Sequence, residues 1–525
     1  MVGHRLSRTD RYLGATVTIE QARWQRGSRR MDTDVVVVGS GAGGAMAASE
    51  IAQGGARVIV LEEGPALRLE DMLQREVEMM ARLYQERGGR ATNDLAIRVL
   101  GGRNVGGSTV HNLNLCKRIP DPILESWARI HRVSGCGPGD LAPVFAAVER
   151  QLRVSSVDPR EYNRNNQLLV RGVEQLGWRG GGLAHNRVGC QGSGFCELGC
   201  PFDAKQNASK VLLPLAERHG ALVLSDARVI RVRHRAGRAY GVEAVALDAD
   251  GRARGEITVD AGAVVLAGSA IGSAVVAALS RLPDPYGQLG RGLRLHPGVA
   301  VAGLFDERVD GFRGIPQAYE CTEWLDLAES SDRRVWITTV FAHPVSAAVM
   351  LPGFGAWHRQ WMLRYSRLAV LTAMVHDHSS GHVGVREDGR ARIHYVLEPD
   401  DSQQLGLGIR ACARLLFAAG ARQVLVPSSP PHVLDRADQV EAVPDSVGRP
   451  HQIAITSVHP LGTMRLGDDP RRAVVSSRAE HHQVRGLFVL DGSLFPTSIG
   501  VPPQLSIYAF ARHLARHVIE RVSER

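Results

Sequence analysis

The sequence predicts an α/β fold that begins with a doubly wound unit, because a strand, a glycine-rich turn, a helix and a second strand follow one another near its start. The β-branched run Asp34–Val38 leads into the turn Gly39–Gly44. The small residues of Ala45–Gln53 suit a helix, and the apolar run Arg57–Leu61 suits a second strand. Strands and helices that alternate in this way build a parallel sheet with helices packed on its faces.

Three glycines of this turn have the spacing of a dinucleotide-binding motif. Gly39 makes the tight turn, Gly41 lets a pyrophosphate lie on the helix N-terminus, and Gly44 lets the helix pack closely on the strand. Glu62 stands at the end of the second strand, where its carboxylate can accept hydrogen bonds from both ribose hydroxyls. The complete unit predicts a dinucleotide site, but it does not decide between FAD and NAD.

The chain has 525 residues, a length that predicts about two to four domains. Hydrophobic residues make up 44% and charged residues 22%. This composition is typical of a globular protein and excludes a disordered chain. Glycine is unusually frequent at 57 residues, but there is no Gly-X-Y repeat, which excludes collagen.

The net charge is +9, and the arginines are scattered among acidic residues rather than gathered in a basic block. We therefore expect no nucleic-acid partner. No run of 18 apolar residues occurs, so we expect no membrane-spanning helix. Three of the seven cysteines fall within eleven residues, which indicates a site rather than a disulfide framework and favours a reducing compartment. We expect a cytoplasmic protein, and the basic charge leaves a peripheral contact with a membrane open.

Residues 1–30 are polar and basic, and we expect them to form a flexible arm unless Met31 is the true start. Arg29 and Arg30 precede an apolar run, as in a twin-arginine export signal. That run continues directly into the glycine-rich turn, so we interpret it as the first strand.

A second glycine-rich segment occupies residues 101–112. A simple NAD-binding fold does not need it, whereas a large flat ring that lies against backbone does. Near the C-terminus, the segment Ser457–Met464 carries His459. A later apolar strand ends at Asp491, and a helix is expected to begin near Pro503.

Together and in this order, these motifs resemble those of the glucose–methanol–choline (GMC) flavin oxidoreductase family over roughly residues 32–520. Within it, the segment Val105–Arg118 looks most like bacterial long-chain alcohol oxidases and dehydrogenases. The resemblance implies a Rossmann-like FAD-binding domain interleaved with a substrate domain built on an antiparallel sheet. It implies FAD-domain segments at 31–120, 201–300 and 451–525, and substrate-domain segments at 121–200 and 301–450.

The resemblance also implies which residues contact FAD. The ADP part matches Gly39, Gly41, Gly44 and Glu62, and the isoalloxazine loop matches Gly106, Gly107, Ser108 and Asn112. Val229 matches a position whose backbone meets the adenine, and Asp491 and Gly492 match the segment at the pyrophosphate and ribityl chain. His111 matches a position that in some branches bonds covalently to the flavin; the alternative is a histidine that only packs or hydrogen-bonds near the ring.

His459 matches the active-site histidine of the family. Alcohol oxidation removes a hydride from carbon, which flavin N5 takes, and a proton from oxygen, which a group with a pKa near 6.5 can take at neutral pH. The resemblance thus implies FAD-dependent oxidation of a lipophilic or secondary alcohol to a carbonyl. The electron acceptor is either oxygen or another redox protein.

One departure affects this interpretation. The family usually places a histidine or asparagine where this chain has Pro502, which has no hydrogen-bonding side-chain group. Either Gln504 or another residue supplies the second catalytic contact, or His459 acts alone. Two other functions stay open, a redox-neutral lyase or isomerase on the same fold and a flavin and iron–sulfur electron-transfer subunit. A second departure is Ser269, at a position that is usually glycine.

Cys190, Cys196 and Cys200 follow the spacing of a bacterial ferredoxin motif, with Ser193 in the second cysteine position. Three thiolates would fit a 3Fe–4S cluster. The segment also resembles that of certain bacterial GMC dehydrogenase subunits, in which such a cluster relays electrons to a cytochrome. The alternatives are thiols without a metal, or zinc with Ser193 or His185 as a further ligand.

The stretch Met350–Met374 is apolar and aromatic, with Arg359, Arg364 and Arg367 interspersed. Three interpretations remain open for it. It lines a hydrophobic channel, rests on a membrane surface, or forms a core helix with a solvated arginine face.

Overall fold

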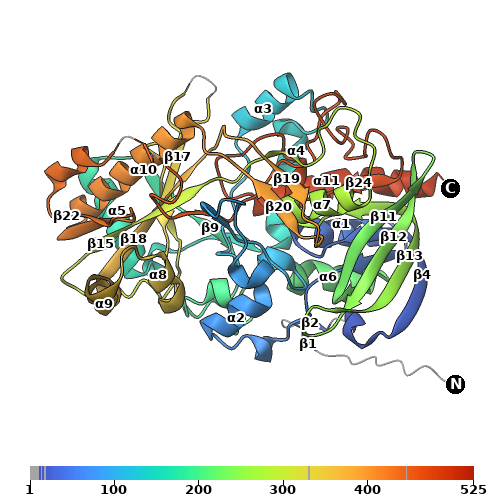
Figure 1. Cartoon of the computed structure of the whole chain (residues 1–525), viewed down its shortest axis with the longest axis horizontal. Coiled ribbons are helices and arrows are strands. Elements are labelled where there is room, and N and C mark those ends of the chain that lie inside the picture. The colour runs from blue at the N-terminus through green and yellow to red at the C-terminus, as the bar shows by residue number, and fades with distance from the viewer. Residues whose placement is uncertain are drawn as a thin grey trace.

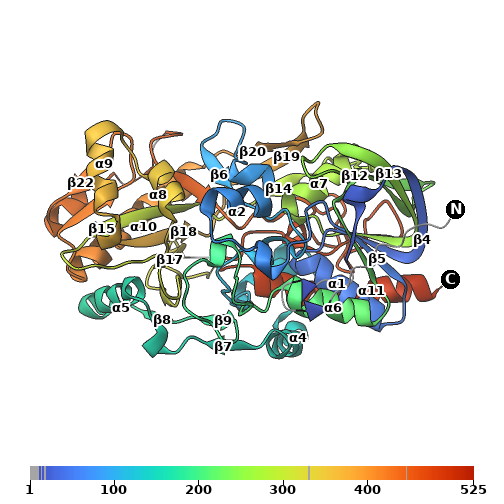
Figure 2. The ribbon, with the colours of Figure 1, turned by 90° about the horizontal axis from the view of Figure 1, so that it is seen from below.

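The computed structural model describes residues 11–12, 15–16, 19–328, 331–444, 446–447 and 449–524. Two lobes lie side by side along the long axis, and each is built around one large sheet (Figures 1 and 2). Each lobe draws on segments that are far apart in the sequence. This confirms the predicted α/β fold, with a doubly wound domain interleaved with a second domain.

The first lobe, on the right of Figure 1, contains an eight-stranded sheet in the described part of the chain. Its central strand β4 (Gly27–Val38) pairs in parallel with β13 (Ala253–Leu266) on one side and β5 (Val58–Leu61) on the other. Residues 35–38 are buried, as expected for a parallel strand that is covered on both faces. The remaining strands are β3 (Ile19–Gln21), β10 (Leu222–Ser225), β11 (Ala227–Arg235), β12 (Arg238–Leu247) and β24 (Leu487–Val489).

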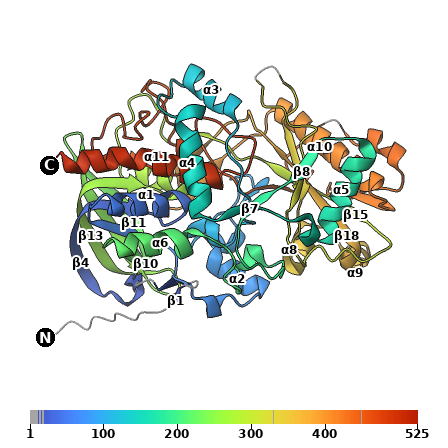
Figure 3. The ribbon, with the colours of Figure 1, turned by 180° about the vertical axis from the view of Figure 1, so that it is seen from behind.

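Three helices gather beside this sheet (Figure 3). α1 (Ala42–Gln53) starts directly after the glycine-rich turn and packs against α6 (Ala208–Arg218) and α11 (Gln504–Ser523). Their apolar side chains form one continuous core with those of the central strands. This packing holds the turn between β4 and α1 in place.

The second lobe contains a nine-stranded sheet in the described residues, antiparallel except for the pair β6–β23. Its strand β18 (Leu368–Val375) lies between β15 (Gly298–Leu304) and β17 (Val335–Thr339). α10 (Pro399–Ala418) packs on these strands and on α5 (Arg164–Leu176), and together they form a second core. The remaining strands are β6 (Ile97–Val99), β8 (Gly180–Gly182), β16 (Tyr319–Cys321), β21 (Gln423–Val426), β22 (His432–Leu434) and β23 (Ile455–Ser457).

Smaller elements surround the two sheets. Short strands form a three-stranded sheet, β14 (Arg291–Leu293), β19 (Gly381–Val385) and β20 (Ala391–His394), and two pairs, β1 (Arg11–Tyr12) with β2 (Ala15–Thr16) and β7 (Val154–Ser156) with β9 (Ala184–Asn186). The remaining α-helices of the described residues are α2 (Glu76–Leu83), α3 (Asp121–Ile130), α4 (Pro138–Gln151), α7 (Ser269–Leu279), α8 (Pro344–Met350) and α9 (Gly355–Leu363). Within the described ranges, no helix has both the length and the apolar character needed to cross a membrane.

Two expectations about the chain's organisation need correction. The expected flexible arm is ordered over residues 19–30, because β3 pairs with β10 and the first part of β4 pairs with β13. Residues 1–10, 13–14 and 17–18 of that arm lie outside the described residues. In addition, β6 and β23 come from segments expected in the FAD domain, but they join the sheet of the second lobe through β15.

Candidate active site

A cavity of about 1060 Å³ is lined by residues from both lobes. At one end lie the turn after β4, the end of β5 and the start of β11. At the other end lie the faces of β15 and β18 and the residues around α8. Most of the predicted site residues line it: Gly39, Gly41, Glu62, Gly107, Ser108, His111, Asn112, Val229, His459, Asp491, Gly492 and Gln504.

The first glycine-rich turn has the geometry that the sequence predicts. Gly39 has φ +100°, and a Cβ there would lie 2.4 Å from the carbonyl oxygen of Ala267. A Cβ at Gly44 would lie 2.0 Å from the carbonyl oxygen of Gly39, so this glycine permits close packing of α1 on the strand. Gly41 has open space beside it, with the Cα of Gly107 the nearest atom at 4.0 Å. Its backbone is therefore available to a ligand in the cavity.

The two glycine-rich loops touch each other. Gly106 and Gly107 have φ +92° and +55°, and a Cβ at Gly107 would lie 2.9 Å from the Cα of Gly41. Ser108 accepts a hydrogen bond from the backbone N–H of Gly102 (2.9 Å), which closes the second loop. Gly44 and Gly106 lie behind the cavity wall, whereas Gly41, Gly107 and Ser108 form its surface. The backbone of these two loops forms a recess, the glycine cradle, which side chains at the glycine positions would fill.

The acidic residues after β5 have different partners. One oxygen of Glu62 accepts hydrogen bonds from the N–H (3.1 Å) and hydroxyl (2.7 Å) of Ser40, and burial raises the pKa of this carboxyl. Glu63 pairs with Arg103 (3.2 Å) and Arg228 (3.1 Å). Burial opposes ionisation of Glu63, but the two arginines outweigh it and lower its pKa. Both carboxylates line the cavity at the end formed by the turn after β4.

Asp491 lies just beyond β24 at the same end of the cavity. It accepts hydrogen bonds from the hydroxyl of Ser273 (2.6 Å) and the N–H of Ser493 (2.8 Å), and burial raises its pKa. Ser269, at the position expected to be glycine, has φ +70°, the left-handed region that glycine adopts more readily. The cradle, the backbone at Val229 and this carboxylate fit an FAD along the cavity.

His459 lies in the loop after β23, is half-buried and lines the cavity. Its Nδ1 is buried without a hydrogen-bond partner in the protein. Desolvation, and to a lesser extent the neighbouring His296, lowers its pKa to about 3. The imidazole is therefore neutral at pH 7.

His296 contacts His459 and is missing from the sequence-based predictions. The two rings meet edge to face with centroids 5.7 Å apart. His296 is buried, and Asp377 accepts hydrogen bonds from the backbone N–H groups of Leu295 (2.9 Å) and His296 (3.2 Å). Nothing in the sequence distinguishes His296 from the other histidines, because the contact forms only in the folded chain.

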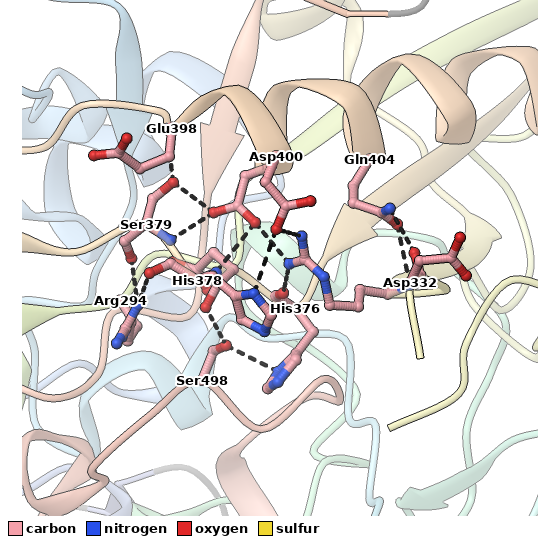
Figure 4. A network of polar contacts seen from close by, with 12 residues as sticks. Arg294, Asp332, His376, His378, Ser379, Glu398, Asp400, Gln404 and Ser498 are labelled. Atoms are coloured by element: carbon pink, nitrogen blue, oxygen red, sulfur yellow. Dashed lines mark hydrogen bonds and ion pairs between the residues drawn. The ribbon is translucent and has the colours of Figure 1, made fainter. Parts of the chain in front are cut away.

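Two buried histidines hold the loop that leads to α11. His296 Nε2 accepts hydrogen bonds from the backbone of Ile499 (3.1 Å) and Gly500 (3.0 Å). Ser498 donates its hydroxyl proton to the carbonyl of Asp377 (3.0 Å), so Nδ1 of His376, at 2.9 Å, is the donor to Ser498 (Figure 4). This arrangement holds residues 498–500 in place, just before Pro502, which lines the cavity.

Arg334, which is ion-paired with Asp401, also hydrogen-bonds to the backbone of His376. Arg334 is buried and donates to Asp401 (2.6 Å), to Asp400 (2.5 Å) and to the carbonyl of His376 (2.6 Å). Figure 4 shows Asp400 and Ser379 on the α10 side of His376 and Ser498 on the other. Asp401 has a lowered pKa despite its burial, because Ser379 and Arg334 hydrogen-bond to its carboxylate.

Gln504, expected as a second catalytic contact, has its amide engaged in the protein. Its oxygen accepts from Asn112 Nδ2 (2.6 Å), and its nitrogen donates to the Leu115 carbonyl (2.8 Å) and to Asn186 Oδ1 (3.3 Å). Both amide protons are thereby used. The geometry suits a residue that positions Asn112 beside the cavity.

His111 packs against an aromatic ring. Its imidazole centroid lies 3.9 Å from that of Tyr84, and its buried Nε2 has no hydrogen-bond partner in the protein. Burial, followed by the positive charge of Lys205, lowers the pKa of His111 to about 3. Covalent attachment to the flavin stays a prediction.

Lys205 was also missed. It is 2% exposed and donates to the carbonyls of Val110 (3.0 Å), Asn112 (2.6 Å) and Cys196 (3.1 Å). These bonds tie the second glycine loop to the cysteine-rich segment. One of only three lysines, it carried no sequence signal for this role.

The structure does not support the expected iron–sulfur site. Cys190, Cys196 and Cys200 are free thiols around a cavity of about 20 Å³, which has room for about one water molecule and not for a cluster. In the described part of the chain, no group of three His, Cys, Asp or Glu residues is arranged to hold a metal ion.

Comparisons with known proteins agree with this fold. Residues 80–298 and 377–511 match two family profiles described as GMC oxidoreductase, and residues 34–73 match an FAD binding domain. A GMC-type oxidoreductase of Mycobacterium tuberculosis is 36% identical over 93% of this chain and 76% of its own length. A long-chain-alcohol oxidase of Arabidopsis thaliana is 27% identical over 94% of this chain and 68% of its own length.

Among solved structures, pyridoxine 4-oxidase from Mesorbium loti superposes with a TM-score of 0.70, covering 92% of this chain and 98% of that one. At 18% identity, the likeness shows the fold. Fold, cradle and profiles together define an FAD-dependent oxidoreductase. Within that class, the chain belongs to the GMC oxidoreductase family.

Proposed function

We propose that this protein oxidises a lipophilic alcohol to the corresponding carbonyl compound, with His459 as the base. One observation carries the proposal. His459, whose Nδ1 has no hydrogen-bond partner in the protein, and the apolar face of the second sheet line the same cavity as the glycine cradle. A base, a hydrophobic wall and a cofactor site are thereby within one enclosure.

The wall is formed by alternate residues of neighbouring strands, whose side chains point to one face of the sheet. Ala300 and Ala302 of β15 and Val370 and Met374 of β18 line the cavity. Thr372 is the polar residue among them, and its hydroxyl donates to the Val299 carbonyl (3.1 Å). Such a wall binds a hydrocarbon chain better than a sugar, which would leave its hydroxyls unpaired.

The protein's own residues account for the proton. The neutral ring of His459 takes the hydroxyl proton of the substrate, and the ordered backbone of residues 498–500 keeps the approach to Pro502 fixed. Pro502 offers no hydrogen-bonding side-chain group, so we propose that His459 acts without a second base. Bound FAD would supply the acceptor for the hydride from carbon.

We further propose oxygen as the electron acceptor. The cavity between the three thiols is too small for the cluster that a relay to another protein would use. The alcohol-oxidising relative from Arabidopsis thaliana is named as an oxidase. Stoichiometric hydrogen peroxide would support this acceptor, and turnover only with an artificial electron acceptor would contradict it.

The substrate proposal is tested with a homologous series of straight-chain alcohols. Each added CH2 that reaches the apolar wall is expected to raise kcat/KM by about fourfold until the wall is filled. An Ala302→Asp variant should flatten this dependence, while short alcohols still react. A glucose-type polyol that reacts better than the long-chain alcohols would contradict the lipophilic substrate class.

A further inference from the structure

We propose that α8 and α9 form a docking surface for an anionic phospholipid bilayer. The proposal rests on the proposed function in one respect, since a lipophilic alcohol would partition into such a bilayer. Figures 1 and 2 both show the two helices next to each other on the second lobe. His358 of α9 joins them, with Nε2 2.9 Å from the carbonyl oxygen of Ala348 in α8.

α8 forms a thin wall between the cavity and solvent. Ser346, Ala347 and Met350 line the cavity, yet no residue of this helix is fully buried. Val345 and Val349 are instead 48% and 74% exposed. One short helix therefore contributes both to the cavity lining and to an apolar outer surface.

The apolar surface continues into α9. Phe354, which precedes this helix, is 90% exposed, and Leu363 at its end is 73% exposed. Isolated exposed apolar side chains are ordinary on soluble proteins. Four of them on two adjoining short helices at a cavity wall are typical of an interaction surface.

The charges of residues 333–376 favour an anionic partner. No Asp or Glu occurs between Asp332 and Asp377. The exposed Arg359, Arg364 and Arg367 take part in none of the ion pairs found among the described residues. Cationic side chains interspersed with exposed apolar ones complement an interface of acyl chains beneath anionic headgroups.

One carboxylate is hydrogen-bonded to the first turn of α8, and it also lines the cavity. Glu76 of α2 accepts hydrogen bonds from the backbone N–H groups of Val345 (2.7 Å) and Ser346 (2.6 Å). It therefore caps the first turn of α8 and stabilises the wall. With the bilayer on the outer side, the opposite side of the same helix faces the proposed substrate cavity.

Flotation of the full-length, FAD-loaded protein with lipid vesicles tests the proposal. Vesicles with about equal parts of phosphatidylcholine and phosphatidylglycerol should carry the protein upward, and those of phosphatidylcholine alone should not. Val349→Ser combined with Phe354→Ser should weaken binding at least tenfold, or about 1.4 kcal/mol. Each of Arg359→Gln, Arg364→Gln and Arg367→Gln should weaken it about fivefold.

Matched controls lie elsewhere on the surface: Val396→Ser, at a valine that is 71% exposed, and Arg471→Gln should bind as the unmodified protein does. Flavin absorbance and turnover of a water-soluble alcohol report that each variant is folded. Equal binding of both vesicle types, or binding that the α8 and α9 variants leave unchanged, would overturn the proposal. So would a dimer that the Phe354→Ser change dissociates, because a second copy would then cover this surface. Vesicle binding is measured without substrate, so a protein that binds vesicles but oxidises no alcohol would refute only the proposed function.

Discussion

Nδ1 of His296 lies 3.5 Å from the backbone carbonyl oxygen of His459, while its Nε2 accepts hydrogen bonds from two backbone N–H groups. Because Nε2 is an acceptor, the ring proton resides on Nδ1 and is directed at His459. One neutral imidazole thus fixes the segment of the proposed base and the loop that leads to α11. This relationship makes His296 a positioning residue.

His296→Ala should lower kcat by about tenfold to a hundredfold, because a small displacement of the base is costly. It should also reduce the free energy of unfolding by about 1–3 kcal/mol, since the N–H groups of Ile499 and Gly500 lose their acceptor. His296→Gln keeps an acceptor near the Nε2 position and should recover much of both. Stopped-flow kinetics and thermal melts measure these effects. An alanine variant that is destabilised but retains full kcat would show a purely structural role.

Gln504→Leu should weaken FAD binding and lower stability by about 1–3 kcal/mol, because Asn112 and the Leu115 carbonyl lose their partner. Once saturated with FAD, the variant should keep kcat within about threefold. Flavin titration followed by steady-state assays at saturating FAD separates the two effects. A fall in kcat of about a hundredfold in the FAD-saturated variant would instead assign Gln504 a direct catalytic contact.

Gly44→Ala should abolish tight FAD binding, because the new methyl group would lie 2.0 Å from the carbonyl oxygen of Gly39 and displace α1. Gly139→Ala is the matched control, since a Cβ at that helical position meets nothing within 4 Å. The control should be slightly stabilised, by about 0.5–1 kcal/mol. The flavin-to-protein absorbance ratio after purification is the measurement. Full flavin content in the Gly44 variant would refute the close packing.

The protein should lose stability steeply on acidification. Burial lowers the pKa of His111, His185 and His459 to about 3, whereas a histidine in an unfolded chain has a pKa of about 6.5. Between these values the unfolded chain binds more protons, so stability that is present above about pH 6.5 is lost as the pH falls towards about 3. Thermal midpoints across this range measure it. His185→Leu removes one buried titrating group and should make the dependence shallower, and a midpoint that does not change with pH would contradict the assignment.

Local features of the site were predictable from the sequence because they depend on neighbouring residues. The turn at Gly39, Gly41 and Gly44 belongs to a strand–turn–helix unit whose glycines each have a steric reason. Contacts between distant segments were not predictable. The pairing of His296 with residues 499–500 and the engagement of the Gln504 amide depend on how the two lobes interleave.

The cysteine segment, residues 190–200, has a local motif without the three-dimensional space that the function of the motif needs. Its spacing matches a cluster motif, but a cluster also requires space between the thiols, and that space is not visible in the sequence. The fold leaves a cavity of about 20 Å³ between the three thiols. The ordered residues 19–30 were missed for a similar reason, because their strand partners lie more than 200 positions away.

Anaerobic mixing of the FAD-loaded protein with a long-chain alcohol tests the central claim most directly. The absorbance of oxidised flavin should disappear in the unmodified protein, and His459→Ala with the same flavin content should react at least about a hundredfold more slowly. Equal rates in the two proteins would contradict His459 as the base. Flavin that stays oxidised with every alcohol tested would contradict alcohol oxidation and favour a redox-neutral reaction in this cavity.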